Sequence, residues 1–150
     1  MIKKFTSATK AKEIKREWHL IDLKDQVLGR TATNIASLLI GKTKSYFATN
    51  LDCGDHIVVI NARLVKVTGK KSSQKIYMSY SGYPGGEKRK TFENVLKEDP
   101  KRIIFQAVSG MLPKNKLRDS MLKRLYIFAD DSHPYQDKFE ARNPKSEKQI

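Results

Sequence analysis

A run of four β-branched residues at positions 57–60, Ile-Val-Val-Ile, constrains the fold more than any other stretch of this chain. Successive side chains of a strand point to opposite faces, so a strand that is apolar at every position must be covered on both faces. Asp55 and Asn61 bound the run and limit it to the length of a strand. We therefore expect a central strand that is buried between other elements.

The stretch before this strand has the periodicity of a helix. Apolar residues recur there at intervals of three or four positions, at Leu28, Ala32, Ile35, Ala36 and Leu39. Because Gly41 is a natural C-terminal stop, this spacing predicts an amphipathic helix over residues 29–40. Residues 18–23 predict a short strand before it. The order strand, helix, strand is typical of a right-handed parallel crossover, so the sequence predicts an α/β domain.

The second half of the chain predicts shorter elements. We expect strands at residues 65–68, 76–80 and 125–128, a polar turn at 69–73, and a helix over about residues 91–97. Asp99-Pro100 places a capping acceptor and a proline at the start of a further helix, which Gly110 ends. A basic helical segment follows, with Leu117, Met121 and Leu122 facing inward. The tail from residue 130 is polar, and we expect it to be irregular.

The charge of the chain is concentrated in three segments. Its 150 residues suit one domain, and 30 Lys and Arg against 16 Asp and Glu give a net charge of +14. Residues 1–16 carry six basic and one acidic side chain, residues 63–90 eight and one, and residues 114–129 five and one. This is expected if several surface elements meet one large polyanion. We divide the chain into a basic N-terminal extension (1–16), a single α/β RNA-binding domain (17–129) and a polar C-terminal tail (130–150).

The segment Ser81-Gly82-Tyr83-Pro84-Gly85-Gly86-Glu87-Lys88-Arg89-Lys90 predicts a shaped cationic loop. Its three glycines and its proline oppose regular structure and restrict the positions of the basic groups. Lys88, Arg89 and Lys90 are suited to phosphates, and Tyr83 is suited to stacking on an unpaired base. The alternative is a solvated hairpin tip, because charged loops are common on protein surfaces.

Two further basic clusters have the same chemistry. The first consists of Lys70, Lys71 and Lys75, before the strand expected at residues 76–80. The second consists of Lys114, Lys116, Arg118, Lys123 and Arg124. We expect both clusters to contact the phosphates of a nucleic acid.

Two motifs raise the alternative of an enzyme. Gly41-Lys42-Thr43 resembles the end of a phosphate-binding loop, but it follows a helix instead of opening one, and Ala36 stands where an earlier glycine is needed. Cys53, Asp55 and His56 are the residue types of a nucleophile, an acid and a base. Catalytic groups must meet in space and usually come from separate elements, so we favour a turn before the central strand, with Cys53 as a packing residue.

The sequence predicts neither a metal site nor a membrane segment. Its single cysteine excludes an intramolecular disulfide, and no pair among His19, His56 and His133 has metal-ligand spacing. No apolar run approaches the ~20 residues of a membrane span, and charged residues occupy the place of a secretory signal. We expect a cytoplasmic protein with no metal, no cofactor, no membrane partner and no small-molecule substrate.

Several short motifs occur in the order and at the separations of a known family. They are Leu28-Gly29-Arg30, Gly41-Lys42, Asp52-Cys53-Gly54-Asp55, Ile60-Asn61-Ala62, Val67-Thr68-Gly69, Lys75-Ile76-Tyr77, Ser81-Gly82-Tyr83-Pro84-Gly85-Gly86 and Gly110-Met111-Leu112-Pro113-Lys114. On these residues the chain resembles the bacterial large-subunit ribosomal protein thirteen family, the universal ribosomal protein L-thirteen family. The resemblance covers about residues 16–135, and the signature at residues 110–130 is its most specific part.

The resemblance implies a three-layer α/β/α domain with a mostly parallel four-stranded central sheet, basic loops and an N-terminal extension. It also implies a structural constituent of the large ribosomal subunit that binds ribosomal RNA, supports subunit assembly and lies beside other large-subunit proteins. By position, the phosphate contacts fall on Arg30, Lys42, Lys44, Lys70, Lys71, Lys88, Arg89, Lys90, Lys114 and Lys116.

The chain departs from the family's pattern at three places, one of which is the tail after Pro134. Arg118-Asp119 stands where family members usually have Gly-Arg, which moves a cation one position earlier and adds a carboxylate. Ile40 stands where an arginine commonly precedes Gly41, which removes one phosphate contact.

Two other functions remain as alternatives at this point. An RNA-processing or RNA-modifying enzyme would depend on Cys53, Asp55 and His56, and Cys53→Ala would abolish its reaction while leaving RNA affinity intact. A free regulator of translation built on the same fold would show a stable cytosolic pool outside ribosomes. We favour a non-catalytic protein of the ribosome that acts by charge neutralisation and shape.

Overall fold

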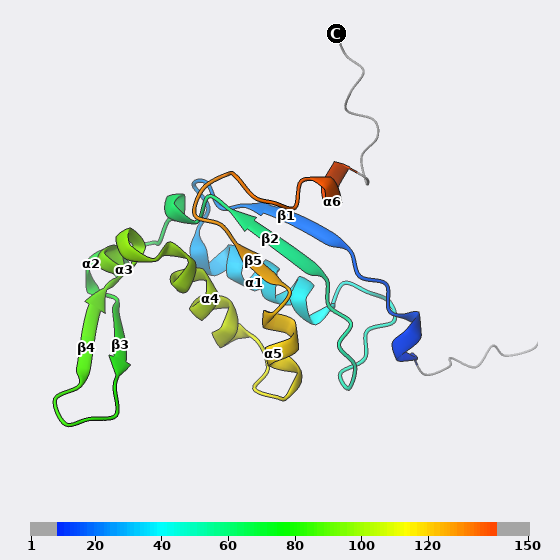
Figure 1. Cartoon of the computed structure of the whole chain (residues 1–150), viewed down its shortest axis with the longest axis horizontal. Coiled ribbons are helices and arrows are strands. Elements are labelled where there is room, and N and C mark those ends of the chain that lie inside the picture. Colours follow the sequence, from blue (N-terminus) through cyan, green and yellow to red (C-terminus); the bar gives the residue numbers. More distant parts are fainter. Residues whose placement is uncertain (1–8, 141–150) are drawn as a thin grey trace, which may run out of the picture.

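A sheet of three parallel strands forms the centre of the computed structural model, which describes residues 9–140 (Figure 1). Strand β1 (Trp18–Asp22) pairs with β2 (His56–Ile60), and β2 pairs with β5 (Leu125–Ile127), so the strand order is β1-β2-β5. All four residues of the β-branched run are buried in β2. The prediction of a covered central strand is therefore confirmed.

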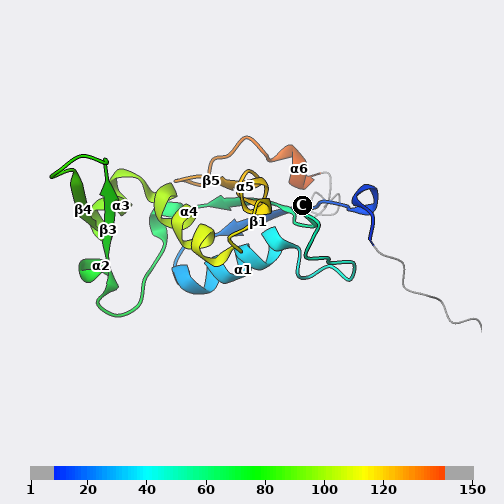
Figure 2. The same cartoon turned by 90° about the horizontal axis from the view of Figure 1, so that it is seen from below.

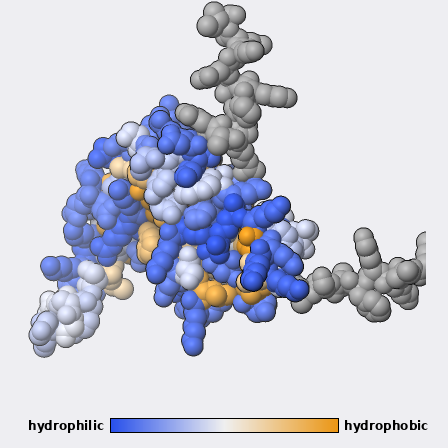
Figure 3. All heavy atoms as spheres, turned by 45° about the vertical axis from the view of Figure 1, so that its right-hand side comes forward, coloured by the Kyte–Doolittle hydropathy of each residue, from blue (hydrophilic) through white to orange (hydrophobic). Residues whose placement is uncertain are grey.

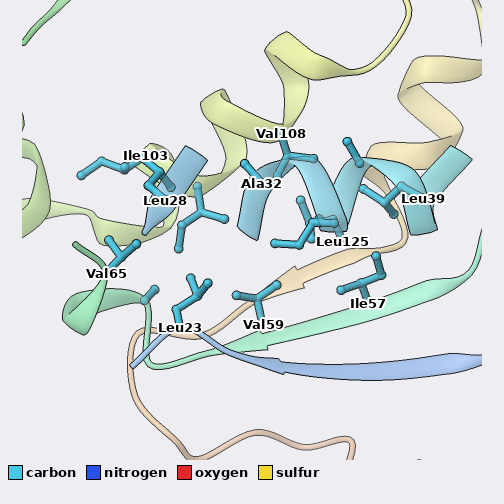
Figure 4. Packing of buried hydrophobic residues seen from close by; sticks show 14 of the residues in the cluster. Leu23, Leu28, Ala32, Leu39, Ile57, Val59, Val65, Ile103, Val108 and Leu125 are labelled. Carbon is cyan, nitrogen blue, oxygen red and sulfur yellow. The ribbon is translucent and has the colours of Figure 1, made fainter. Parts of the chain in front are cut away.

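The main core lies on one face of this sheet, against α1 (Leu28–Ile40) and α4 (Pro100–Met111) (Figure 4). Ile57, Val59 and Leu125 point from the strands toward the helices, and Val108 meets them from α4. Burial of each such aliphatic side chain contributes about 1.5–3 kcal/mol. The helix predicted over residues 29–40 is confirmed, and Gly41 ends it in the left-handed region at φ 82°, where its N–H bonds to the carbonyls of Ser37 and Leu38.

The second face of the sheet is covered by aromatic rings and by the segment that follows β5. The ring of Trp18 stacks on His56 at 4.4 Å and on Tyr126 at 5.6 Å, and Tyr135 packs 4.6 Å from Tyr126. The short helix α6 (Asp137–Glu140) lies on this side, opposite α1 (Figure 2). The expected irregular tail thus contains a helix and packs on the sheet over residues 130–140. Residues 141–150 of that tail lie outside the described residues.

The architecture is mixed α/β with a parallel sheet, but it differs from the expected one in two respects. Within residues 9–140 the central sheet has three strands, because residues 65–68 form only an isolated bridge between Val27 and Lys66 instead of a fourth strand. The second face carries only the segment with α6, so a full helical third layer is not found in the described part of the chain.

A second, separate sheet projects from the body as a hairpin (Figure 1). Strand β3 (Ile76–Tyr80) is antiparallel to β4 (Glu87–Thr91), and Gly86 N–H closes the turn between them on the carbonyl of Tyr83. The expectation of an irregular loop over residues 81–90 is therefore wrong for its second half, which is strand. At the base of the hairpin lie α2 (Lys71–Gln74), where a turn was expected, and α3 (Phe92–Glu98).

The remaining elements follow the sequence closely. Asp99 caps α4 by accepting from the Arg102 N–H at 3.4 Å, and α4 continues one residue beyond Gly110, its predicted end. The basic helical segment is α5 (Leu117–Leu122), with Met121 buried. Short 3₁₀ helices occur at Ala11–Glu13 and Ala62–Leu64.

The described part of the expected N-terminal extension contacts the loop after α1. Thr9 donates to the carbonyl of Tyr46 at 3.0 Å, and Tyr46 donates to the carbonyl of Lys15 at 3.1 Å. Residues 1–8 of the extension lie outside the described residues.

Candidate nucleic-acid interface

Cations from distant parts of the sequence converge at the start of α1. Arg30, in the first turn of α1, lines a hollow of about 500 Å³ together with Lys71 and Lys75, which lie at the two ends of α2. All three side chains are exposed. Lys70 adds a fourth cation beside an adjoining hollow of about 460 Å³, which Lys71 and Lys75 also line. The sequence predicts each of these residues but not that Arg30 meets the others.

Helix α1 adds to the positive potential of this hollow. Its N-cap residue, Val27, has no side-chain acceptor for the first N–H groups of the helix. The helix dipole places a partial positive charge at this end, where Leu28 and Gly29 line the hollow. Three cations and a helix N-terminus around one concavity are suited to a phosphate group.

A second group of exposed cations lies near the other end of α1. Lys42, directly after the Gly41 stop, lines a hollow of about 400 Å³ with Pro113 and Asn115. Lys114 and Lys116 flank Asn115 and are exposed. The fold therefore brings Lys42 to the segment that carries the most specific part of the family signature. Lys123, in the same predicted cluster, is exposed at the end of α5.

Two predicted phosphate contacts point into the protein instead. Lys44 forms an ion pair with Asp55, and the two side chains are 10% and 3% exposed. Arg124 forms an ion pair with Asp52, with 8% and 15% exposure, and also donates to the carbonyl of Leu39 at 3.4 Å. The buried carboxylate of Asp55 neutralises Lys44, and the half-buried carboxylate of Asp52 neutralises Arg124, so neither cation belongs to the exposed surface.

Asp55 is the centre of a small polar cluster under the start of β2. Besides Lys44, its carboxylate accepts from the Glu17 N–H at 2.9 Å and contacts His19 Nε2 at 3.1 Å. Burial would raise the pKa of Asp55, but hydrogen bonds from Lys44, Glu17 and His19 outweigh burial, and the pKa of Asp55 is lowered. Asp55 thus remains a carboxylate that fixes Lys44 and the residues before β1.

Arg118 is half-buried and also has a structural contact. Its Nη2 donates to the Ser109 hydroxyl, which connects α5 to α4. Its Nε is buried, with no hydrogen-bond partner within residues 9–140. The departure from the family's Gly-Arg therefore places a cation between two helices, while Asp119 is exposed.

The cations of the hairpin differ in whether an acidic side chain of the same chain pairs with them. Arg89 Nε bonds to Glu87 at 2.7 Å, and Lys90 is paired with Glu98 of α3. Lys88 is exposed, and no ion pair involves it in the described residues. Tyr83, at the tip, is 74% exposed.

The three candidate catalytic residues have no catalytic arrangement. Cys53 is fully buried, and the Asp55 carboxylate is occupied by the contacts described above. Burial lowers the pKa of His56, and the charges of Arg124 and Arg16 lower it further. The His56 ring is stacked against Trp18. Each of the three residues therefore has a packing or ion-pairing role.

Over residues 9–140, no group of three His, Cys, Asp or Glu side chains is placed to hold a metal ion. Within the same range, no helix combines the length and the apolar character needed to cross a membrane.

The ion pairs that Asp52 and Arg16 form were not predicted from the sequence. Arg16 lies 3.8 Å from the Asp52 carboxylate, which also holds Arg124. The motif Asp52-Cys53-Gly54-Asp55, with two carboxylates directly before a buried strand, was the available signal. A carboxylate at such a position needs a cationic partner.

Comparison with known proteins decides the family. The model of the family described as Ribosomal protein L13 matches residues 16–134. The chain belongs to the ribosomal protein L13 family. The L13 match begins at Arg16 and ends at Pro134. It therefore includes the hollow at the start of α1, the Asp55 cluster and the hairpin.

Similar L13 proteins cover nearly the whole chain. A relative from Pseudomonas entomophila is 49% identical over 130 residues, which cover 87% of this chain and 92% of the relative. One from Herpetosiphon aurantiacus is 46% identical over 130 residues, with 87% and 90% coverage. One from Geobacter sp. (strain M21) is 44% identical over 141 residues, with 94% and 96% coverage. All three are named large ribosomal subunit protein uL13.

Proposed function

We propose that this chain is a structural, non-catalytic constituent of the large ribosomal subunit, which binds ribosomal RNA through exposed cations and supports subunit assembly. Its relatives carry the name of a large-subunit protein. The convergence of Arg30, Lys71 and Lys75 on one hollow carries the proposal for RNA. A phosphate in that hollow would meet three cations at once.

The proposed contact surface consists of the exposed members of the predicted set. They are Arg30, Lys42, Lys70, Lys71, Lys75, Lys88, Lys114, Lys116 and Lys123, with Tyr83 as a stacking residue. Lys44 and Arg124 are left out because carboxylates neutralise them inside the protein. Arg89, Lys90 and Arg118 contribute less, because each has a partner within the chain.

The buried ion pairs support this function indirectly. Lys44 and Arg124 attach the loop of residues 41–55 to the residues before β1 and to the start of β5. Lys42 lies in this loop. We infer that the pairs hold Lys42 at a fixed position relative to Lys114, as recognition of a folded RNA by its shape requires.

The salt dependence of RNA binding tests the role of the hollow. Arg30→Ala combined with Lys71→Ala should weaken binding to large-subunit ribosomal RNA. If about eight phosphate contacts form, the wild-type slope of log affinity against log salt concentration is near −6 to −7, and the double variant loses about 1.5–2 units of it. Filter binding over a salt series measures both slopes.

Lys24→Ala combined with Lys97→Ala provides the matched control. Both residues are exposed and outside the proposed surface, and the double variant removes the same total charge. Its slope should remain close to that of the wild type. Equal losses of slope in the two double variants would show that binding follows net charge alone and would refute the assignment of the hollow.

A further inference from the structure

The projecting hairpin has two faces of different chemistry. On one face, β3 presents Ile76, Met78 and Tyr80, which are 53%, 64% and 67% exposed. On the other face, Tyr77 is 7% exposed and packs toward Phe92 of α3, with ring centroids 6.5 Å apart. Because successive side chains of a strand point to opposite faces, Tyr77 faces inward, and Ile76, Met78 and Tyr80 form an apolar row on the outward face.

The outward face carries no net charge. The strand register places Thr91, Arg89 and Glu87 of β4 opposite Ile76, Met78 and Tyr80. Arg89 and Glu87 neutralise each other through their 2.7 Å ion pair. We call these six residues the outer hairpin face. Its neutrality stands out in a chain with a net charge of +14.

The inward face differs in charge. It carries Lys88 and Lys90, opposite Ser79 and Tyr77, and Lys75 lies 5.2 Å from the Tyr77 ring. The cations of the hairpin other than Arg89 therefore lie away from the apolar row. Figure 3 shows the hairpin at lower left as a paler arm beside the mostly blue body.

An RNA partner does not suit the outer hairpin face. Phosphates need free cations, and the guanidinium of Arg89 is already paired. Unpaired bases stack on aromatic rings or on arginine planes. In the middle of this face Met78 lies opposite Arg89, whose guanidinium is held by Glu87, and of the six residues only Tyr80 offers a ring. The carboxylate of Glu87 would also repel a phosphate backbone.

A second copy of the chain does not suit it either, because two chains with a net charge of +14 repel each other. A neutral, aliphatic row is complementary to apolar side chains of a different protein.

We propose that the outer hairpin face docks an apolar segment of a neighbouring protein in the assembled large subunit. This rests on the proposed function, since the assembly supplies the neighbour. The face is small, and alone it would give a weak interface. RNA contacts elsewhere on the chain would hold the two proteins together, and the high effective concentration would make a small contact sufficient.

Site-specific photo-crosslinking in purified large subunits tests this proposal. A photo-crosslinking amino acid replaces Tyr80 on the outer face in one variant and Lys88 on the inward face in another. We expect the Tyr80 variant to give an adduct with one protein of the subunit, identified by mass spectrometry.

Met78→Asp, added to the Tyr80 variant, should reduce the yield of that adduct about tenfold, because a buried Met side chain contributes enough for such a change. Ser79→Asp, which adds the same charge on the inward face, should leave the yield unchanged.

Each other outcome has a distinct meaning. An adduct of the Tyr80 variant with RNA, or with no component of the subunit, overturns the docking proposal and leaves the proposed function intact. An equal loss of yield with Met78→Asp and Ser79→Asp also overturns it. Failure of the wild-type chain to enter large subunits at all overturns the proposed function together with it.

Discussion

Gly54 occupies a position where the backbone leaves no room for a side chain. A Cβ built there would lie 1.7 Å from the carbonyl oxygen of Leu39 and 2.8 Å from Arg124 Nη2. The end of α1 and the buried Arg124 both approach the loop at this one residue. Glycine is thus required here by close approach, and a methyl group could enter only if the backbone shifted.

Gly54→Ala should therefore destabilise the fold strongly. We expect a loss of about 2 kcal/mol or more in the free energy of unfolding, because the overlap cannot be relieved by a rotamer change. Gly110→Ala is the matched control: Gly110 lies in α4, and apart from its chain neighbours and the backbone of its own helix no atom of the described residues lies within 4 Å of its built Cβ. Its effect should stay within about 1 kcal/mol, in the stabilising direction. Urea unfolding of both variants measures the difference, and equal effects would contradict this account.

At the same scale, Lys44 and Arg124 mark a limit of sequence reasoning. Arg124 belongs to a basic stretch, and Lys44 is a phosphate contact that the family resemblance implies. Their partners, Asp55 and Asp52, lie 11 and 72 residues away in the chain. Only the fold determines that these pairs meet, so composition could predict the sign of the surface but not which cations remain on it.

At the scale of elements, the pair of Asp52 and Arg124 connects three parts of the fold. Asp52 lies in the loop before β2, Arg124 directly precedes β5, and the carbonyl of Leu39 belongs to the last turn of α1. Arg124 is buried, so removing the carboxylate of Asp52 leaves the charge of Arg124 without its ion-pair partner, which is strongly destabilising.

Asp52→Ala should lower the free energy of unfolding by about 3 kcal/mol. The comparison is Asp130→Ala, which breaks the ion pair with Arg63. The side chains of Arg63 and Asp130 are 61% and 66% exposed. That change should cost within about 0.5 kcal/mol, since water screens an exposed pair. Thermal and urea unfolding check both values. A small effect of Asp52→Ala would mean that Arg124 finds another partner and that the pair does not hold the three elements.

The elements themselves were largely predictable, for identifiable reasons. The β-branched run and the helical spacing from Leu28 to Leu39 are local signals, and both elements form where they are expected. Residues 65–68 have a strand-like pattern but lack a neighbouring strand, so only one bridge forms. The alternation of residues 76–80 predicts a strand but not which of its faces is buried. Tyr77 faces inward because its ring packs toward Phe92, which follows β4 in the sequence.

At the scale of the whole molecule, the net charge of +14 is divided by the fold into surfaces with different roles. Part of it is neutralised inside, at Lys44 and Arg124. Part gathers around the hollow at the start of α1 and beside Lys42 at its other end. The outer hairpin face is left neutral. The proposed RNA contacts thus lie on the body and at Lys88 and Tyr83 of the hairpin, and the outer hairpin face is the proposed contact for another protein.

The most direct test of this account is the amount of the chain in purified large subunits after a salt wash that removes loosely bound basic proteins. A structural constituent should remain in a constant ratio to the large subunit, with little of it free in the cytosol. The variant with Arg30→Ala and Lys71→Ala should be depleted from the washed subunits, whereas that with Lys24→Ala and Lys97→Ala should remain. A wild-type chain that washes off, or that stays mostly outside ribosomes, would contradict the account.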